Sequence, residues 1–170
     1  GSSAQPLGRL QNSNVPTVAI GANGGPLTHS ILTQLANKPD VANAAFENQA
    51  FVLHPDSTGK MEATPVVAGY PVFLWNNASA TPVAGRRAVR TTNLPSDLAK
   101  GSGTNLTAAI FGAWNQLQIV MFSGLDLIIN PFSEDKEGNV RITMHQDVDL
   151  NALYPEAFAK AVDVSTGAWA

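Results

Sequence analysis

Residues 105–158 constrain the fold most, because short apolar runs and turn residues alternate there in a closely specified order. A charged segment at residues 133–138 predicts a tip between the last two long strands. The whole stretch contains few residue types that enzymes use, so it predicts a β-rich structural unit. We expect a buried strand at 107–111, a short helix at 114–121, an apolar strand at 125–129 and a long alternating strand at 140–150.

The first part of the chain predicts helices and turns around two short strands. Thr28 is a candidate N-cap, Ile31, Leu32 and Leu35 follow at helical spacing, and Pro39 is expected to close that helix. We expect strands at 15–20 and 50–53, with turns at 21–26 and 56–60.

The middle of the chain predicts further strands and connectors. Residues 66–75 are strongly β-forming, and Pro71 should keep that strand at a sheet edge because proline cannot donate to the ladder. Residues 86–92 alternate as a strand, and residues 94–105 predict a long connector. Many short strands with one or two helices indicate the α+β class.

Composition excludes several kinds of protein. Only 14% of the 170 residues are charged, against about a quarter in a typical domain. This suggests that much of the surface meets other protein. The net charge of -3 gives no basic field for nucleic acid. The chain has no cysteine, which excludes disulfides and thiolate metal sites, and no apolar run near the ~20 residues that span a membrane.

Few residues suggest chemistry. His29, His54 and His145 lie far apart without ligand spacing, so we expect structural or surface roles for them. Asp147 and Asp149 would share one face of the predicted strand, where two carboxylates could act as acid and base or bind a cation. Salt bridges to a neighbouring subunit are the preferred interpretation. Phosphate-loop and nucleophile-elbow motifs are absent from the sequence.

The order of these elements resembles the C-terminal part of the major capsid proteins of tailed bacteriophages, which have the Hong Kong 97-type fold. The resemblance covers nearly the whole chain. Two segments depart from the family pattern, Phe122-Ser123-Gly124 and Leu153-Tyr154. The matching elements are Gln5-Pro6-Leu7-Gly8, residues 24–28, Phe51 to Pro55, residues 67–72, Leu94-Pro95, residues 100–106, residues 110–112, Gly124-Leu125-Asp126, Asn130-Pro131-Phe132, residues 146–149 and Pro155 to Phe158.

The resemblance implies a division of the chain. Residues 1–20 would form an extended N-terminal segment with a peripheral-domain strand, residues 21–130 the axial domain, and residues 131–170 the returning strands of both domains. Members of the family also carry an upstream arm, an extended β-hairpin and a long spine helix. We therefore expect this chain to be a fragment of a longer protein.

The resemblance also implies a function without enzymatic activity or a cofactor. The protein would be a structural subunit of the icosahedral head of a phage or prophage. Copies would assemble into hexamers and pentamers around the DNA genome, near which the protein would lie without binding it specifically. Scaffold, portal or decoration proteins are further candidate partners, and no membrane is expected. The subunit would occupy the host cytoplasm before assembly and the virion afterwards.

The candidate contact residues are charged. Loops 76–85 and 94–103 are candidate axial contacts. We expect Arg86, Arg87 and Arg90 to pair with acidic residues of a neighbouring copy. Those residues would be Asp97 or the acidic tip, which contains Glu134, Asp135 and Glu137.

Three alternatives stay open from the sequence. An encapsulin-like shell protein would share the fold but enclose enzymes rather than DNA. A small β-rich carbohydrate-binding module could use Tyr70 and Trp75 as a stacking platform. An enzyme could use Asp147 and Asp149. Trp75, Trp114 and Trp169 are otherwise expected to anchor a core or an interface.

Overall fold

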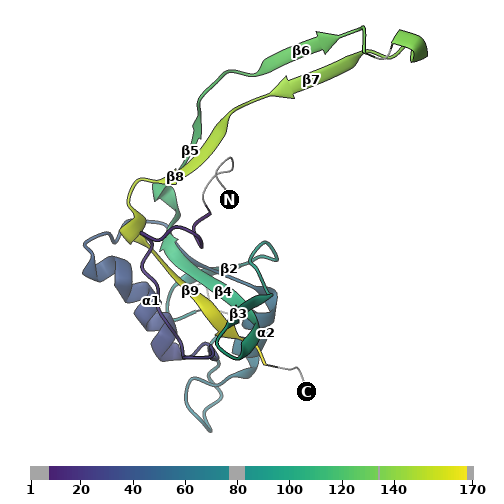
Figure 1. Ribbon diagram of the computed structural model, residues 1–170. Coiled ribbons are helices and arrows are strands. Elements are labelled where there is room, and N and C mark those ends of the chain that lie inside the picture. Colours follow the sequence, from purple (N-terminus) through teal and green to yellow (C-terminus); the bar gives the residue numbers. More distant parts are fainter. Residues whose placement is uncertain (1–7, 77–82, 134, 168–170) are drawn as a thin grey trace.

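The computed structural model describes residues 8–76, 83–133 and 135–167, and of Asp135 only the backbone. It has two parts, a body of helices packed on a sheet and a long β-ribbon that projects from it (Figure 1). We call this ribbon the arm, and it comprises residues 117–152. The arm continues the central strand of the body, so the two parts share one stretch of backbone.

A sheet built around one long strand forms the body. The central strand is β4 (Gly103–Ala113), which pairs antiparallel with β1 (Gln49–Leu53), β3 (Leu98–Lys100) and β9 (Phe158–Ser165). The edge strand β2 (Arg87–Arg90) pairs parallel with β1. The predicted strand at 107–111 is therefore confirmed, and it is longer than expected. The predicted connector at 94–105 instead contains β3 and the tight turn to β4.

Two helices cover one face of this sheet. Helix α1 (His29–Val41) begins at Thr28, whose Oγ1 accepts a hydrogen bond from the Ile31 amide, as predicted. Pro39 does not close the helix, because it lies inside the last turn and the helix continues to Val41. The buried side chains of α1 include Leu32 and Leu35.

Helix α2 (Pro55–Ala63) replaces the predicted turn at 56–60. His54 caps it, since its Nδ1 accepts a hydrogen bond from the Asp56 amide at 3.3 Å, and Pro55 provides a favourable first position. Met61 on this helix is 1% exposed and joins the core. Tertiary packing thus outweighs the low helix propensity of Gly59.

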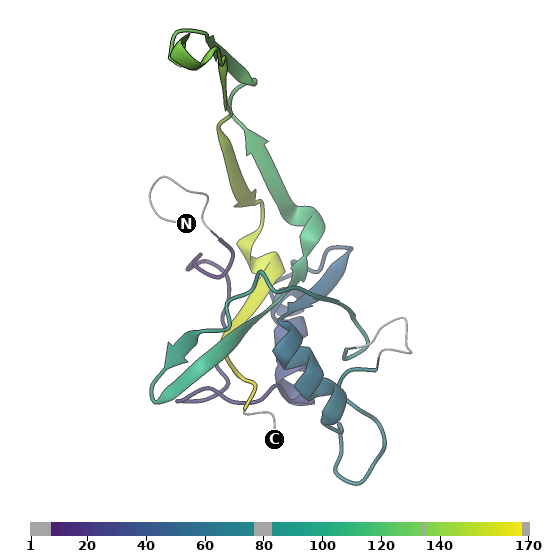
Figure 2. The same cartoon turned by 90° about the vertical axis from the view of Figure 1, so that its right-hand side faces the viewer.

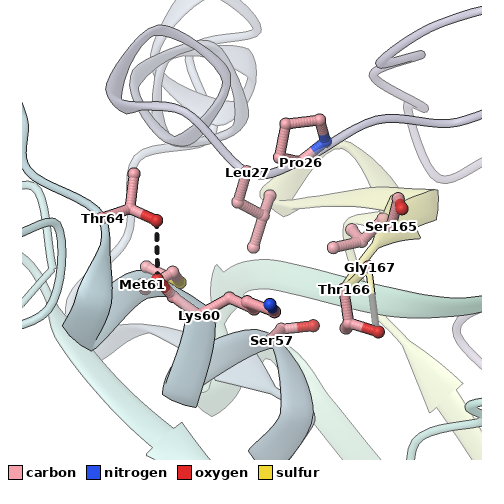
Figure 3. A pocket seen from close by; sticks show the side chains of 10 residues that line it. Pro26, Leu27, Ser57, Lys60, Met61, Thr64, Ser165, Thr166 and Gly167 are labelled. Carbon is pink, nitrogen blue, oxygen red and sulfur yellow. Dashed lines mark hydrogen bonds between the residues drawn. The ribbon is translucent and has the colours of Figure 1, made fainter. Parts of the chain in front are cut away.

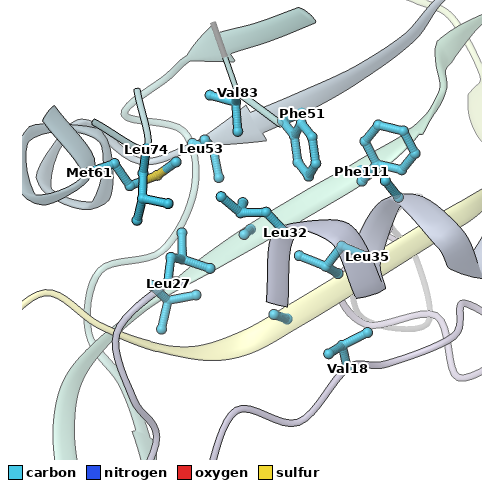
Figure 4. Close-up of a cluster of buried hydrophobic side chains, with 14 of the residues drawn as sticks. Val18, Leu27, Leu32, Leu35, Phe51, Leu53, Met61, Leu74, Val83 and Phe111 are labelled. Carbon is cyan, nitrogen blue, oxygen red and sulfur yellow. The ribbon is translucent and has the colours of Figure 1, made fainter. Parts of the chain in front are cut away.

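The main core lies between the helices and the sheet (Figure 4). Phe51 and Phe111 are registered partners on β1 and β4, and their rings lie 4.5 Å apart between centroids. Leu32 and Leu35 of α1 pack in the same cluster. The neighbouring pair, Val52 and Ile110, points to the opposite face because side chains alternate along a strand.

The chain before α1 pairs with the outer edge of β9. The Val18 amide donates to the Lys160 carbonyl at 2.8 Å, and the Gly25 amide donates to the Asp163 carbonyl at 3.0 Å. The predicted strand at 15–20 is reduced to an isolated bridge between Thr17 and Lys160. This segment covers what would be an open strand edge.

Two more predictions are wrong. Residues 66–75 form a loop rather than a strand, exposed from 66 to 73, with isolated bridges from Pro65 to Phe73 and from Trp75 to Val83. Of the helix predicted at 114–121, only the single turn η1 (Trp114–Gln116) is helical, and the chain then enters the arm.

Four strands and two short turns complete the chain. The strands are β5 (Leu117–Met121), β6 (Asp126–Asn130), β7 (Arg141–His145) and β8 (Val148–Ala152). The predicted strand at 125–129 corresponds to β6, and the predicted tip at 133–138 contains η2 (Asp135–Glu137). The strand predicted at 140–150 divides into β7 and β8. A last turn, η3 (Pro155–Ala157), leads into β9.

Candidate assembly surfaces

The arm consists of two antiparallel ladders in succession. Strand β5 pairs with β8 from Leu117–Ala152 to Met121–Val148, and β6 pairs with β7 from Asp126–His145 to Asn130–Arg141. Opposed residues share a face of such a ribbon, and successive residues alternate between its faces. One face is therefore wholly apolar. We call it the apolar stripe, and it comprises Leu117, Ile119, Met121, Leu127, Ile129, Ile142, Met144, Val148, Leu150 and Ala152.

The opposite face of the arm is mostly polar. Gln118 lies opposite Asn151, and Val120 lies opposite Asp149. Further out, Asp126 lies opposite His145 and Asn130 opposite Arg141, with Ile128 and Thr143 between them. The arm is thus amphipathic along both ladders, as expected for a ribbon that packs on one side.

A bend between the ladders leaves the stripe in phase. The Phe122 amide donates to the Asp147 carbonyl at 3.0 Å, which extends the first ladder by one pair. The next registered pair is Asp126 with His145, so three residues (123–125) face a single residue, Gln146. The excess is two, an even number, so apolar side chains stay on the same side of both strands. Figure 1 shows the change of direction at this place.

The base of the apolar stripe packs on the body, since Ala152 is 4% exposed and Leu117 lies against the same buried cluster. Beyond this base, the stripe is exposed to solvent in the described part of the chain. Ile129 is 60% exposed, Ile142 58% and Met144 64%. Soluble monomers rarely expose a contiguous apolar patch of this extent, and larger patches mark interfaces. The stripe therefore indicates a surface that is covered by further protein.

The predicted acidic tip lies at the far end of the arm (Figure 1). Glu137 is exposed in η2, whereas Glu134 and the side chain of Asp135 lie outside the described residues. The tip also exposes an aromatic ring, since Phe132 is 83% exposed. Asp97 is exposed just before β3 in the body. Asp97 and the tip are thus at different ends of the molecule.

The three arginines of the predicted cluster have different environments. Arg86 donates to the Gln49 side chain, and its Nη2 lies 3.5 Å from Asp40 Oδ2. Arg90 forms an ion pair with Glu62, and its guanidinium lies 4.8 Å above the Trp75 ring. Arg87 is exposed, and its side chain borders a hollow beside Asn48 and Val89. Two of the three arginines therefore have partners within the chain.

The two predicted aspartates do not share an unbroken strand. Asp147 lies in the break between β7 and β8, where its amide donates to Ser123 Oγ at 3.3 Å, and Asp149 lies in β8. His29 is exposed in the first turn of α1, and His145 ends β7. Across residues 8–76, 83–133 and 135–167, no cluster of three or more His, Asp or Glu could hold a metal ion.

The tryptophans of the body act as anchors. Trp75 is 5% exposed in the main core. Trp114 packs edge-on against Phe158 and donates from Nε1 to the Ala50 carbonyl at 3.0 Å. Trp169 lies outside the described residues. In the described part of the chain, no helix is long and apolar enough to cross a membrane.

A hollow of about 300 Å³ lies between α2 and the end of β9 (Figure 3). Leu27, Met61 and Val164 line it with the side chains of Ser57 and Lys60. The Ser57 hydroxyl is engaged elsewhere, since it lies 2.6 Å from Thr107 Oγ1 in a hydrogen bond.

A larger groove of about 770 Å³ lies on the sheet face opposite the helices. Val52, Ile110 and Val162 form its floor from three adjacent strands, and Leu94 and Leu98 form part of its wall. Arg9 lies at this groove and donates from Nη2 to the Leu150 carbonyl at 3.3 Å. Burial lowers the pKa of Arg9, and the nearby charge of Asp149 opposes that shift.

Two buried charges on β9 hold neighbouring segments. Lys160 donates from Nζ to the carbonyls of Leu10 at 2.7 Å and Asn12 at 2.8 Å, and burial lowers its pKa. Asp163, which is 1% exposed, accepts from Lys100 Nζ at 2.5 Å and from the Ile20 amide at 2.9 Å. These contacts serve the fold of the body.

Comparison with known proteins identifies the family of this chain. The model of a family described as the phage capsid family matches residues 1–163. The chain belongs to the phage capsid family. Its members are structural proteins, and the resemblance seen in the sequence is confirmed. A curated relative is the major capsid protein of Halomonas phage phiHAP-1, 24% identical over 161 residues, which are 95% of this chain.

Solved structures share the Hong Kong 97-type fold, so the predicted α+β fold class is confirmed. The capsid of an empty GTA particle matches with a TM-score of 0.60 and 18% identity, over 96% of this chain and 55% of that chain. A structure from Mycobacterium phage Che8 matches with a TM-score of 0.56 and 12% identity, over 87% of this chain and 53% of that chain. A structure from Gordonia phage Cozz matches with a TM-score of 0.53 and 20% identity, over 94% of this chain and 55% of that chain. This capsid-family chain spans 24% of the curated relative and about half of these solved chains.

Three surfaces were missed by sequence reasoning. The apolar stripe could have been found from the alternation of Leu117, Ile119 and Met121, which was interpreted as a helix. The loop at residues 65–75 could have been recognised as a contact surface from its lack of charged residues. The groove on the open sheet face has no sequence signal, because its lining comes from six separate segments.

Proposed function

We propose that this chain is the axial domain and the returning peripheral strands of a major capsid protein that builds the head of a bacteriophage or prophage. In this proposal, residues 21–116 belong to the axial domain, and the arm is peripheral, including residues 117–130, which the sequence had assigned to the axial domain. Copies assemble into hexamers and pentamers that enclose the DNA genome. The protein has no enzymatic activity and needs no cofactor.

The uncovered apolar stripe is the observation that carries this proposal. An isolated ribbon with Ile129 and Ile142 more than half exposed is poorly suited to exist alone in water. Within a family of shell proteins, upstream segments of the same protein and neighbouring copies would cover it. Arg9 supports this arrangement, because its contact with the Leu150 carbonyl places the described N-terminal end beside the base of the arm.

Charged contacts between copies form the second part of the proposal. Arg87 is the best candidate of the arginine cluster, since Arg86 and Arg90 already have acidic partners within the chain. Its partner would be Asp97 or the acidic tip of a neighbouring copy, which includes Glu134, Asp135 and Glu137. Net charge disfavours specific DNA binding, so the genome would be a neighbour rather than a ligand.

Negative-stain electron microscopy of the complete gene product tests this function. We expect closed shells or five- and six-membered rings, either from the protein alone or with scaffold, protease and portal genes expressed beside it. A monodisperse small species under both conditions would contradict the proposal. Before assembly the protein should fractionate with the host cytoplasm, and afterwards with particles.

A further inference from the structure

The loop at residues 65–75 joins two properties that seldom occur together on a soluble surface. Residues 63–85 contain no charged side chain, over more than one-tenth of the chain. Within the loop, Val67 is 62% exposed, Tyr70 69%, Val72 51% and Phe73 42%. Exposed apolar surface without charged neighbours is poorly solvated, so it indicates a site of contact with another molecule.

The loop has a defined backbone structure. The Tyr70 amide donates to the Val67 carbonyl at 3.1 Å across a turn in which Gly69 has a φ of 82°. The Val66 amide donates to the Val72 carbonyl at 2.7 Å, and the Leu74 amide donates to the Thr64 carbonyl at 3.0 Å. A preformed loop loses less conformational entropy when it binds.

The base of the loop is fixed to the body. Leu74 and Trp75 are 4% and 5% exposed, and both belong to the main core. The Trp75 amide donates to the Met61 carbonyl of α2 at 3.3 Å. Because its base is held in the core, the loop presents its apolar side chains outward.

The loop projects from the end of the body that lies away from the arm (Figures 1 and 2). Covering the apolar stripe of the arm therefore leaves this loop uncovered. The loop and the apolar stripe thus lie at opposite ends of the described part of the molecule.

We propose that the loop at residues 65–75 contacts the axial domain of a second copy of this chain, an inference that rests on the proposed function. A subunit that enters both five- and six-membered rings must bind its neighbour at two different angles. Hydrophobic contact is non-directional and tolerates such a change, whereas ion pairs depend on geometry. An uncharged loop with a defined backbone suits this task.

Matched valine substitutions test the inference in the complete gene product. Val67→Glu places a charge in the loop, and Val41→Glu places the same charge on α1, where Val41 is 72% exposed. We expect Val67→Glu to lower the assembled fraction about tenfold or more, because a buried carboxylate would oppose the contact, and Val41→Glu to change it less than about twofold. Tyr70→Glu should act like Val67→Glu. Both residues are exposed, so melting temperatures of the unassembled variants should match the unchanged protein.

Amide hydrogen exchange gives an independent readout on the unchanged protein. Residues 66–73 should become protected when unassembled protein forms rings or shells. Normal assembly of Val67→Glu and Tyr70→Glu, or exchange at 66–73 that is the same before and after assembly, would overturn the inference and leave the proposed function intact. Protection that appears only after a different protein is added would overturn it too. Failure of the unchanged protein to assemble under any condition would remove the proposed function and this inference together.

Discussion

The ring of Phe158 fills the space beside Gly112 that a side chain would otherwise occupy, and the two residues are registered partners of β9 and β4. A Cβ atom built on Gly112 would collide with the ring. Phe158 is completely buried and packs edge-on against Trp114 at the point where the body meets the arm. Glycine is therefore required here by packing rather than by backbone conformation.

Gly112→Ala should destabilise the chain by about 1–3 kcal/mol, since the fully buried ring of Phe158 would have to shift to admit the new methyl group. Urea unfolding followed by circular dichroism measures this loss. Gly124→Ala in the arm is the matched control, because nothing lies within 4 Å of its Cβ position. Equal stability of the two variants would show that the Phe158 ring relaxes freely.

The buried amine of Lys160 should make stability depend on pH in the alkaline range. Burial lowers the folded-state pKa of Lys160 below the ordinary value of 10.5, so the unfolded chain binds more protons between these two values. The contribution of Lys160 to the unfolding free energy should therefore rise with pH across that window and be lost as pH falls through the folded pKa. Unfolding of the unchanged chain and of Lys160→Met at several pH values isolates this contribution. A difference that is constant from neutral pH to 10.5 would contradict it.

Two adjacent isoleucines distinguish the faces of the arm. Ile129→Asp places a charge in the apolar stripe, whereas Ile128→Asp places it on the polar face of the same strand. The two side chains are 60% and 49% exposed in this chain, so each variant should keep the stability of the chain within about 0.5 kcal/mol. In the complete gene product, Ile129→Asp should abolish shells while Ile128→Asp still forms them, as counted by electron microscopy. Equal assembly of the two variants would mean that the apolar stripe remains exposed to solvent in the assembled shell.

Charge reversal at Arg87 tests the proposed polar contact between copies. Arg87→Glu should weaken assembly of the complete gene product, and added salt should recover part of the loss, because salt screens the repulsion between the new carboxylate and its acidic partner. A surface pair contributes about 0–1 kcal/mol, so the loss per contact should be small but repeated in every ring. Light scattering across a salt series measures the effect. Unchanged assembly of Arg87→Glu would argue against an ionic contact at this position.

The sequence predicted where secondary-structure elements occur along the chain better than whether each is a helix, a strand or a loop. The helix after Thr28 and the strands around Phe51 and Phe111 were predictable, because a cap and apolar periodicity mark them locally. Helix α2 was not, since Ser57, Thr58 and Gly59 are poor helix formers that are held helical by packing. Residues 66–75 have strong β propensity, but they lack a partner strand and Pro71 removes a donor.

The contact surfaces were less predictable than the fold, because exposure depends on which elements lie beside each other. Arg86 and Arg90 formed an obvious cluster in the sequence, yet their partners Asp40 and Glu62 are distant in the chain. Residues 117–121 were predicted as part of a helix, and only the pairing of β5 with β8 in the arm gives Leu117 and Ile119 their place in the apolar stripe.

The two-residue excess at the bend of the arm has a consequence for how such chains can vary. Adding or deleting two residues at 123–125 would alter the curvature of the ribbon and leave every apolar side chain on its present side. A one-residue insertion would rotate Leu127 and Ile129 onto the opposite side. Length variation among relatives at this place should therefore occur in steps of two, and the curvature of a shell could change without replacement of any side chain on the stripe.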